Sequence, residues 1–519
     1  MAKILVFLVL FTSINEDQEV QQEGVYKRQF DNVRVAVDVF VTAVACLSER
    51  GCHDDDANNR CGDTGMSCRN GTCVYCERDA DCYPSYGTES ICSHESLMRQ
   101  SLPAGVTQCI HKRLWRPSLR DYIGGVLLFF SSAIAGSSGL GGGGLFVPIL
   151  YLLCQFDAHE AVPLSKAMIF GGALANLLMN IPKRFPGRPN ITQIDYNVAA
   201  FMVPTVLAGT SLGVALNVMF PSWIILILLA VTLLITTWRM ITKGVQKMRE
   251  ELKSGERQPL LNNASASEVN EVNPFESYEQ KPLYRLIPFL LVLALLLIEA
   301  YVVAMTLLRG SKSRPSIIGV KVCSPEYYGI FSALFAGCFI FLIILGTITL
   351  KKSRRREISL DSAGRTSQLT VRWNKKNMAG VTFGGFIGGI LAGLVGIGGG
   401  MVSSPILLEI GVHPQIVVAT STFLIIFTSS TTTIQYLLFQ KLPWDYSIAY
   451  GVMTFFANIL GNLFIDYLVK KYKKTFIIIF IVAAVVGASA VMLTVSGGIT
   501  VYRSLRSGEV PLFGSLCDV

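Results

Sequence analysis

Two clusters of glycine, "GLGGGG" at 139–144 and "GIGGG" at 396–400, lie inside apolar stretches of the chain. Glycine has no Cβ, so its main chain can approach another backbone or present N–H groups to a ligand. Unwound main chain at membrane depth is tolerated only where it is buried or lines a cavity. A short helix beginning after each cluster, at Leu145 and at Met401, would point its positive end at the glycines, which favours an anion. The first chemistry that these residues predict is therefore binding of a small anion.

Both glycine clusters also fit a second interpretation, in which small residues only allow membrane helices to pack closely. Either interpretation explains one cluster alone. Pro148 and Pro405 follow the clusters at matching distances. We expect both prolines near helix starts, where the missing N–H costs least.

The regions around the two clusters repeat each other. "GLGGGGLFVPIL" at 139–150 aligns with "GIGGGMVSSPIL" at 396–407, and "AVPLS" at 161–165 aligns with "VVATS" at 417–421. Similarity at one long offset, with the same order of apolar runs after it, indicates internal duplication. The duplication favours a binding site over close packing. The predicted substrate-binding residues are Gly139, Gly141, Gly142, Gly143, Pro148, Ser165, Lys166, Gly396, Gly398, Gly399, Gly400, Pro405, Ser421 and Thr422.

Lys166 is an ionisable residue within an apolar run, and we expect it to face protein or water and to neutralise an anion. The alternative is that its side chain snorkels to the nearby membrane interface. The hydroxyls of Ser165, Ser421 and Thr422 can serve either a ligand or helix-to-helix bonds. The candidates for a proton relay are Glu299, Glu409 and Asp466, and the sequence does not select among them.

The elements that must position these residues are membrane helices. Of the 519 residues, 51% are hydrophobic, and the mean hydropathy is +0.47. These values predict an all-α polytopic membrane protein. Runs long enough to approach the ~30 Å of a bilayer core occur at 122–137, 160–181, 196–220, 223–243, 285–308, 328–350, 378–395, 416–439, 446–469 and 475–495, with shorter runs at 145–155 and 401–410.

Positive charge predicts how the helices are oriented, because Lys and Arg favour the cytoplasmic side. If each glycine cluster is the tip of a broken hairpin, the basic segments 182–188, 243–253, 351–377 and 470–474 all become cytoplasmic. The first repeat then begins outside and the second begins inside. Such inverted-topology repeats, each with a glycine-broken hairpin, are typical of secondary transporters.

The N-terminal region predicts passage through the secretory pathway. Residues 1–14 have the layout of a signal peptide, and nine of the 13 cysteines fall in a small region that resembles a disulfide-stapled lumenal or extracellular domain. A zinc knuckle at Cys73 and Cys76 is the less favoured reading. One cysteine must pair elsewhere, for example with Cys323 or Cys517, or stay free. Asn70 begins a glycosylation sequon. The disulfide candidates are Cys46, Cys52, Cys61, Cys68, Cys73, Cys76, Cys82, Cys92 and Cys109.

The predicted organisation places the repeats on either side of a linking pair of helices. The cytoplasmic loop carries "ERQPLL" and "NPF", which resemble sorting signals and make sorting adaptors candidate partners. The predicted boundaries are 1–14 signal peptide, 15–118 cysteine-rich region, 119–243 first membrane repeat, 244–284 flexible cytoplasmic loop, 285–350 linking helices, 351–377 basic cytoplasmic linker, 378–495 second membrane repeat and 496–519 C-terminal tail.

The glycine-motif segments resemble a known family. "GLGGGGLFVPIL" followed by "AVPLSKAMIFGGA", and "GLVGIGGGMVSSPILLEIGVHPQIVVATST", resemble the sulfite exporter TauE/SafE family over roughly 122–495. "DYNVAAFMVPTVLAGTSLGVALNVMF" and "SWIILILL" resemble its eukaryotic branch of plants and protists. The resemblance implies a multi-pass transporter whose bacterial relatives move small sulfur-containing anions such as sulfite or sulfoacetate.

We therefore expect an integral membrane protein of the plasma membrane or endomembranes that transports, and exports, a small anion. Its expected partners are the lipid bilayer, that anion and a coupling proton. The alternatives are a receptor that uses the cysteine-rich domain and a sorting scaffold that uses the cytosolic loop. No enzyme motif, metal site or cofactor-binding motif is found, and the net charge of +9 needs no nucleic acid, because the cytoplasmic loops explain much of it.

Overall fold

The computed structural model describes residues 67–69, 72–74, 90–93, 108–115, 117–137, 141–185, 188–257, 282–311, 316–361, 375–409, 412, 414–472 and most of 486–498. These residues all belong to one compact unit, Leu47–Val519. The predictions that lie outside the described residues are the signal peptide, Asn70, Gly139, the sorting motifs, the C-terminal tail apart from Gly498, most of the last predicted run, Cys46, Cys52, Cys61, Cys76 and Cys82.

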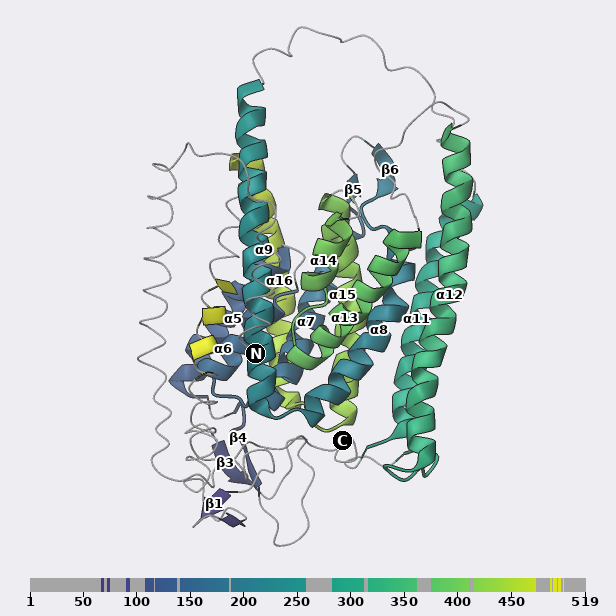
Figure 1. Cartoon of the computed structure of the whole chain (residues 1–519). Helices are drawn as coiled ribbons and strands as arrows, with labels where there is room; N and C mark the ends of the chain where they lie inside the picture. Colours follow the sequence, from purple (N-terminus) through teal and green to yellow (C-terminus); the bar gives the residue numbers. More distant parts are fainter. Residues whose placement is uncertain are drawn as a thin grey trace. The chain divides into compact units, whose positions relative to one another are not determined.

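Nine helices in the described part of the chain are long and apolar enough to cross a membrane. This confirms the prediction of a mostly helical, polytopic membrane protein (Figure 1). The nine are α5 (Leu119–Ser137), α7 (Ala158–Asn180), α8 (Tyr196–Met219), α9 (Ser222–Arg257), α11 (Pro282–Arg309), α12 (Pro325–Asp361), α13 (Lys375–Val395), α15 (Pro414–Leu438) and α16 (Trp444–Tyr472).

Two short helices follow the glycine clusters. Helices α6 (Gly143–Leu152) and α14 (Gly400–Glu409) have 10 residues each. Such a helix is about 15 Å long, half the thickness of a bilayer core. Both begin earlier than predicted, so Pro148 and Pro405 lie inside them rather than near their starts. The expectation about the prolines was wrong in this respect. Each proline removes the bond to the carbonyl four residues before it.

Helices α9 and α12 continue past their predicted ends. α9 runs to Arg257, into the segment predicted as a flexible loop, and α12 runs to Asp361, into the predicted basic linker. The predicted boundaries at 243 and 350 mark only where the apolar run stops. Lys, Arg, Glu and Gln are good helix formers and follow each run, so the backbone stays helical beyond the apolar part.

Burial separates central from peripheral helices. The most hydrophobic window of α8 is 94% buried inside the protein, whereas those of α11 and α12 are 22% and 28% buried. Phe289 on α11 and Ile343 on α12 are exposed, as expected of side chains that face lipid. Helix α8 is therefore part of the centre around which the site is built.

Helices α8 and α13 pack through two stripes of glycine. A Cβ added to Gly209 would meet the Phe386 carbonyl and lie 3.0 Å from the Gly389 Cα, and Gly213 and Gly393 face each other in the same way. Four-residue spacing of small residues lets two membrane helices approach backbone to backbone. Close packing therefore explains these helical glycines.

Contacts between the two blocks of helices that the sequence predicts to be repeats follow an exchange pattern. Suppose that α5, α6, α7 and α8 correspond, in this order, to α13, α14, α15 and α16. The contact between α5 and α16 then has its counterpart in the contact between α13 and α8. The contact between α7 and α16 has its counterpart in the contact between α15 and α8. All four contacts are present, and α7 also packs against α15 (Figure 1). Such exchange is what a two-fold relationship between the blocks produces.

Within the described ranges, three antiparallel pairs of strands accompany the helices, and the sequence patterns above did not predict them. They are β1 (Ser67–Arg69) with β2 (Thr72–Val74), β3 (Ser90–Ser93) with β4 (Gln108–His111), and β5 (Arg184–Phe185) with β6 (Arg188–Thr192). Cys68 pairs in register with Cys73, and Cys92 with Cys109. Cys92 takes part in a disulfide, and so does Cys323. The disulfide-rich domain as a whole stays a prediction.

The end of β4 is held against the membrane helices. The His111 ring stacks on Phe156 at 3.8 Å between centroids, and its Nε2 lies 3.1 Å from the Cys154 carbonyl oxygen. Next to it, Lys112 Nζ lies 2.8 Å from Asp121 Oδ2 in a buried ion pair. The hairpin that precedes α5 is thus anchored to the segment between α6 and α7.

Candidate functional site

The two glycine motifs, defined as 139–144 and 396–400, cross each other in direct contact. A Cβ added to Gly143 would lie 2.5 Å from the Gly396 carbonyl oxygen and 2.8 Å from the Gly398 nitrogen. A Cβ on Gly141 would lie 3.3 Å from the Gly398 Cα. No side chain fits between the strands of main chain here. The structure thus brings together Gly141, Gly143, Gly396 and Gly398, which the sequence placed far apart.

Glycine is required at this crossing for a second reason. Gly141, Gly142 and Gly396 have φ angles of 81°, 75° and 79°, in the left-handed region that residues with a Cβ rarely adopt. Gly142 is also the N-cap residue, directly before α6, and no side chain caps the helix. Positive φ turns the chain sharply, so each motif ends one helix and starts the next inside the protein.

Helices α6 and α14 both begin at the crossing. The Leu145 nitrogen donates to the Gly142 carbonyl at 2.9 Å, and the Met401 nitrogen donates to the Gly398 carbonyl at 3.0 Å. The first N–H groups of a helix have no acceptor within it and carry about half a positive charge. Two such ends meeting in buried surroundings can stabilise an anion.

The carbonyls at the end of α13 and in the second motif are occupied by side-chain donors. The last carbonyls of a helix lack an intrahelical partner, so buried ones need another donor. Here each of four carbonyls accepts a hydrogen bond from a side chain of α7, α8 or α15. The pairs are Tyr436 Oη to Gly393 at 2.7 Å, Asn217 Nδ2 to Leu394 at 2.7 Å, Ser165 Oγ to Gly396 at 3.1 Å and Lys166 Nζ to Ile397 at 2.7 Å.

Lys166 lies inside the protein rather than at a membrane interface. Its side chain is 0% exposed, which contradicts the snorkelling alternative. Among the described residues, no carboxylate lies within 4.0 Å of Nζ, and the Ile397 carbonyl is its hydrogen-bond acceptor. The partial negative charge at the end of α13 partly compensates the ammonium. Lys166 is therefore a buried amine beside the crossing, placed where it can carry a positive charge toward an anion.

Each of the two helices α7 and α15 contacts the glycine motif of the other predicted repeat. Ser165 and Lys166 of α7 bind the second motif, whereas Ile425 of α15 lies 3.2 Å from a Cβ added to Gly141 of the first. Thr422, which follows Ser421 as Lys166 follows Ser165, donates to the Val418 carbonyl at 2.8 Å. Ser421 accepts a hydrogen bond from Ser404 at 2.9 Å and so bridges α15 to α14.

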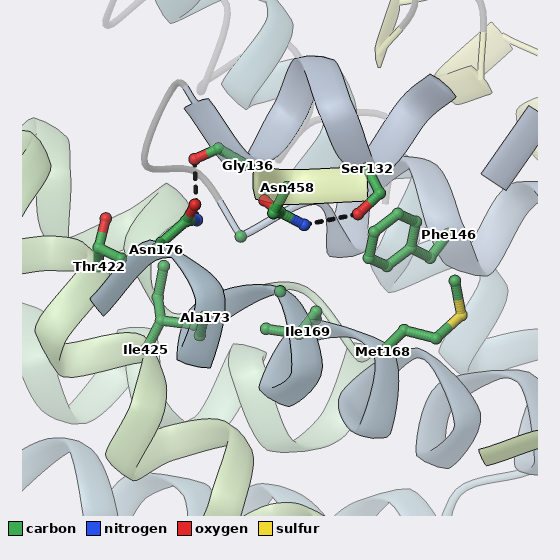
Figure 2. A pocket seen from close by; sticks show the side chains of 12 residues that line it. Ser132, Gly136, Phe146, Met168, Ile169, Ala173, Asn176, Thr422, Ile425 and Asn458 are labelled. Carbon is green, nitrogen blue, oxygen red and sulfur yellow. Dashed lines mark hydrogen bonds between the residues drawn. The ribbon is translucent and has the colours of Figure 1, made fainter. Parts of the chain in front are cut away.

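A small cavity lies beside the first motif (Figure 2). Its volume is about 10 Å³, room for about one water. The lining residues come from α5, α6, α7, α15 and α16 and from the first motif. They are Ser132, Gly136, Gly141, Phe146, Met168, Ile169, Gly172, Ala173, Asn176, Thr422, Ile425 and Asn458. Gly141 and Thr422 of the predicted site line it, and Lys166 does not.

Amide side chains form the polar wall of this cavity. Asn458 Nδ2 donates to Ser132 Oγ at 2.7 Å, and Asn176 Nδ2 donates to the Gly136 carbonyl at 3.0 Å (Figure 2). Asn462 Nδ2 donates to Asn176 Oδ1 at 2.6 Å. Asn458 Oδ1 is buried without a hydrogen-bond partner. A buried polar atom of this kind is an available contact for a water or a ligand.

The other predicted residues are placed differently. Gly399 and Gly400 lead into α14, and Pro148 and Pro405 lie within the short helices, outside the cavity lining. Of the proton-relay candidates, Glu299 accepts hydrogen bonds from Ser430 and Thr431, whereas the side chains of Glu409 and Asp466 lie outside the described residues. Sequence reasoning missed Ser132, Asn217 and Tyr436. Their only signal was a polar group within an apolar run.

Comparison with known proteins gives a consistent match. The family model described as "Sulfite exporter TauE/SafE" matches residues 124–296 and 315–489. The chain is 30% identical to Sulfite exporter TauE/SafE family protein 5 of Arabidopsis thaliana over 429 residues, 79% of this chain and 93% of the relative. It is 30% identical to family protein 1 of the same plant over 405 residues, 77% of this chain and 89% of the relative.

A bacterial relative matches a shorter region. The probable membrane transporter protein YunE of Bacillus subtilis (strain 168) is 29% identical over 153 residues, 28% of this chain and 55% of the relative. No solved structure matches.

Proposed function

Since the chain belongs to the sulfite exporter TauE/SafE family, we propose that it is a secondary transporter that exports a small anion bound where its two glycine motifs cross. It is an integral membrane transporter and not an enzyme. The substrate class that we propose is a sulfur oxyanion, sulfite or a small organosulfonate. The names of the Arabidopsis relatives support this class.

One observation carries the proposal: α6 and α14 both begin where the motifs touch, with Gly143 against Gly396 and Gly398. The main chain offers N–H groups and helix dipoles at that point, and Lys166 adds a buried positive charge beside it. Secondary transporters that bind anions use the starts of broken helices in this way. The contacts therefore suit recognition of negative charge near the middle of the membrane.

The exchange of contacts between blocks supports inverted repeats. Correspondence of α5 through α8 with α13 through α16 predicts each pairing that the two blocks make. The distribution of Lys and Arg supports opposite orientations, because only broken hairpins leave the basic segments on one side. In such an arrangement one repeat rocks against the other about the bound substrate. Lys166 and Ser165, which join α7 to the second motif, lie at the contact between the moving parts.

The proposal is tested by flux through liposomes that contain the purified full-length protein. Efflux and uptake of radiolabelled sulfite, sulfate and sulfoacetate are measured at two pH gradients. Flux of at least one of these anions above empty liposomes is expected, and dependence on the gradient would identify proton coupling. Efflux faster than uptake under mirrored gradients would support export.

Two variants make the assay specific to the site. In Gly142→Val, a β-branched residue is forced into left-handed backbone, and flux is expected to fall to background. Gly125→Ala is the matched control, because a Cβ there meets nothing within 4 Å. Equal flux in both variants, or no flux of any of the three anions from folded protein, would contradict the proposal.

A further inference from the structure

A second small cavity lies between α8, α11, α12 and α15, away from the glycine crossing. Its lining includes Ser211, Thr306, Arg309, Phe331, Gln435 and Phe439. Arg309 is the last residue of α11 and is only 5% exposed. The cavity thus combines a buried guanidinium with hydroxyl and amide groups.

The Arg309 guanidinium is surrounded by aromatic rings, and none of the described residues gives it an anionic partner. Its central carbon lies 5.0, 4.6 and 5.6 Å from the ring centroids of Tyr327, Phe331 and Phe439. It makes no hydrogen bond or ion pair with a described residue, and its buried Nε has no partner. Ring faces and the end of α11 attract the charge only weakly. A buried cation normally requires a paired anion, so this one is under-compensated.

The groups beside Arg309 add hydrogen-bonding capacity. Gln435 Nε2 donates to Ser211 Oγ at 2.9 Å and lies 3.5 Å from Thr306 Oγ1. Gln435 Oε1 is buried without a partner. The hydroxyls of Ser211 and Thr306 already donate to the carbonyls of Leu207 and Val302, so the free donors in this cavity belong to Arg309. Guanidinium groups recognise oxyanions through parallel N–H bonds, and the Arg309 guanidinium therefore matches a small oxyanion.

We propose that this cavity is a second anion-binding site, in which Arg309 recognises the charge of a small oxyanion. The ligand that we propose is the transported anion, and in this respect the inference rests on the proposed function. The geometry of the site does not depend on that function. Met305, Thr306 and Arg309 fall between the two segments that match the family model, which end at 296 and resume at 315. The family match therefore does not extend to these residues.

The volume of the cavity sets a condition on binding. In this conformation it is about 10 Å³, close to one water. An oxyanion binds only if the ring side chains turn or α12 shifts against α11. Both helices are peripheral, with few buried residues in their spans, so such a shift disturbs less packing than movement at the centre.

Equilibrium binding of radiolabelled sulfate to the full-length protein in detergent tests the proposal. Wild-type protein is expected to bind two sulfates per chain, one at the glycine crossing and one at Arg309. Arg309→Gln should bind one, and Gly142→Val should retain the one at Arg309. Lys321→Gln, which removes an exposed charge from the segment between α11 and α12, is the matched control and should bind two.

Failure of this site and failure of the proposed function give different results. One sulfate in wild type and none in Arg309→Gln would support the second site while removing the first. Unchanged stoichiometry in folded Arg309→Gln would overturn the second site and leave Arg309 as a cation stacked on rings. If Arg309→Gln does not fold, Arg309→Lys keeps the cation but removes the parallel N–H pair and should weaken sulfate binding there about tenfold; unchanged binding would overturn the proposal.

A lipid headgroup is the other source of such an oxyanion. Inorganic phosphate and phosphatidylglycerol are therefore added separately as competitors in the binding assay. Displacement of the Arg309-dependent sulfate by inorganic phosphate supports a soluble anion. Displacement by phosphatidylglycerol alone would overturn that assignment in favour of a lipid.

Discussion

The two glycine motifs have similar sequences but different surroundings. Four side chains, including Lys166, donate hydrogen bonds to main-chain carbonyls in the second motif and directly before it. The first motif instead borders a cavity, with Thr422 at the position equivalent to Lys166. Both motifs lead directly into a short helix, although positive φ angles occur at Gly141 and Gly142 in the first motif and at Gly396 in the second. Different side chains at equivalent positions, such as Lys166 and Thr422, explain why the second motif is hydrogen-bonded to its neighbours whereas the first borders a cavity.

This difference suggests that the two motifs have different roles in transport. A motif tied to α7 and α8 by hydrogen bonds is held in place, whereas a motif beside a cavity has room for a ligand or for movement. Thr422 and Asn458 on the open side supply polar groups without charge. The following substitutions test this difference, beginning with the crossing that both motifs share.

Gly143→Ala should have the largest effect, because it separates the two motifs. The added Cβ would lie 2.5 Å from the Gly396 carbonyl oxygen, and backbone cannot rotate away as a side chain can. We expect flux at background and a loss of stability of roughly 2–4 kcal/mol, typical of overpacking against rigid surroundings. Thermal unfolding and liposome flux measure both effects. Gly125→Ala is the control, and wild-type flux in Gly143→Ala would show that contact at the crossing is dispensable.

Lys166→Met should separate transport from stability. The substitution keeps the length of the side chain but removes the donor to Ile397 and the buried charge. If the bond to Ile397 keeps the second motif in its binding position, its loss should lower the flux roughly ten- to hundredfold, because a charged hydrogen bond is removed. Removing a buried amine that no carboxylate pairs with offsets the loss in folding, so the thermal midpoint should stay near or above that of wild type. A parallel fall in flux and midpoint would instead assign Lys166 a purely structural role.

Thr422→Met tests whether the open side must stay open. A longer apolar side chain at this position fills the cavity beside Gly141 without adding charge. We expect flux to fall about tenfold, equivalent to 1.4 kcal/mol, with little change in the thermal midpoint. Thr422→Val, which keeps the volume and removes the hydroxyl, is the matched control. Normal flux in Thr422→Met would remove the functional distinction between the two motifs.

Gly399→Ala should have the smallest effect. Its φ angle is not among the positive ones, and a Cβ would lie 3.3 Å from the Thr428 side chain, which can shift slightly. We expect less than about 1 kcal/mol of destabilisation and flux close to wild type. The same two assays apply. Loss of flux here, with retained stability, would show that the second motif contacts substrate more closely than its occupied carbonyls indicate.

The positions of the membrane helices follow from the sequence because apolar length alone fixes them. The ends of α9 and α12 do not, since helix-forming charged residues extend both helices beyond the apolar run. The glycine motifs were recognisable as equivalent and were predicted to lie on either side of the bound anion. Their direct main-chain contact was not predicted, because nothing local in 139–144 specifies which atoms of 396–400 it meets. The partners of Lys166 and Asn217 were likewise hidden. The sequence shows that a buried donor needs an acceptor, but it does not show which helix end supplies that acceptor.

The kind of atom that each glycine faces sets which mutations can be reversed by a second change. A Cβ on Gly136 would overlap the side chain of Asn458, so a smaller residue at 458 could restore the fit. A Cβ on Gly143 meets only main chain of the second motif and the Ile169 side chain, and no substitution shortens a backbone. In a genetic screen, intragenic suppressors are therefore expected for defects at 136, whereas defects at 143 should return only by true reversion.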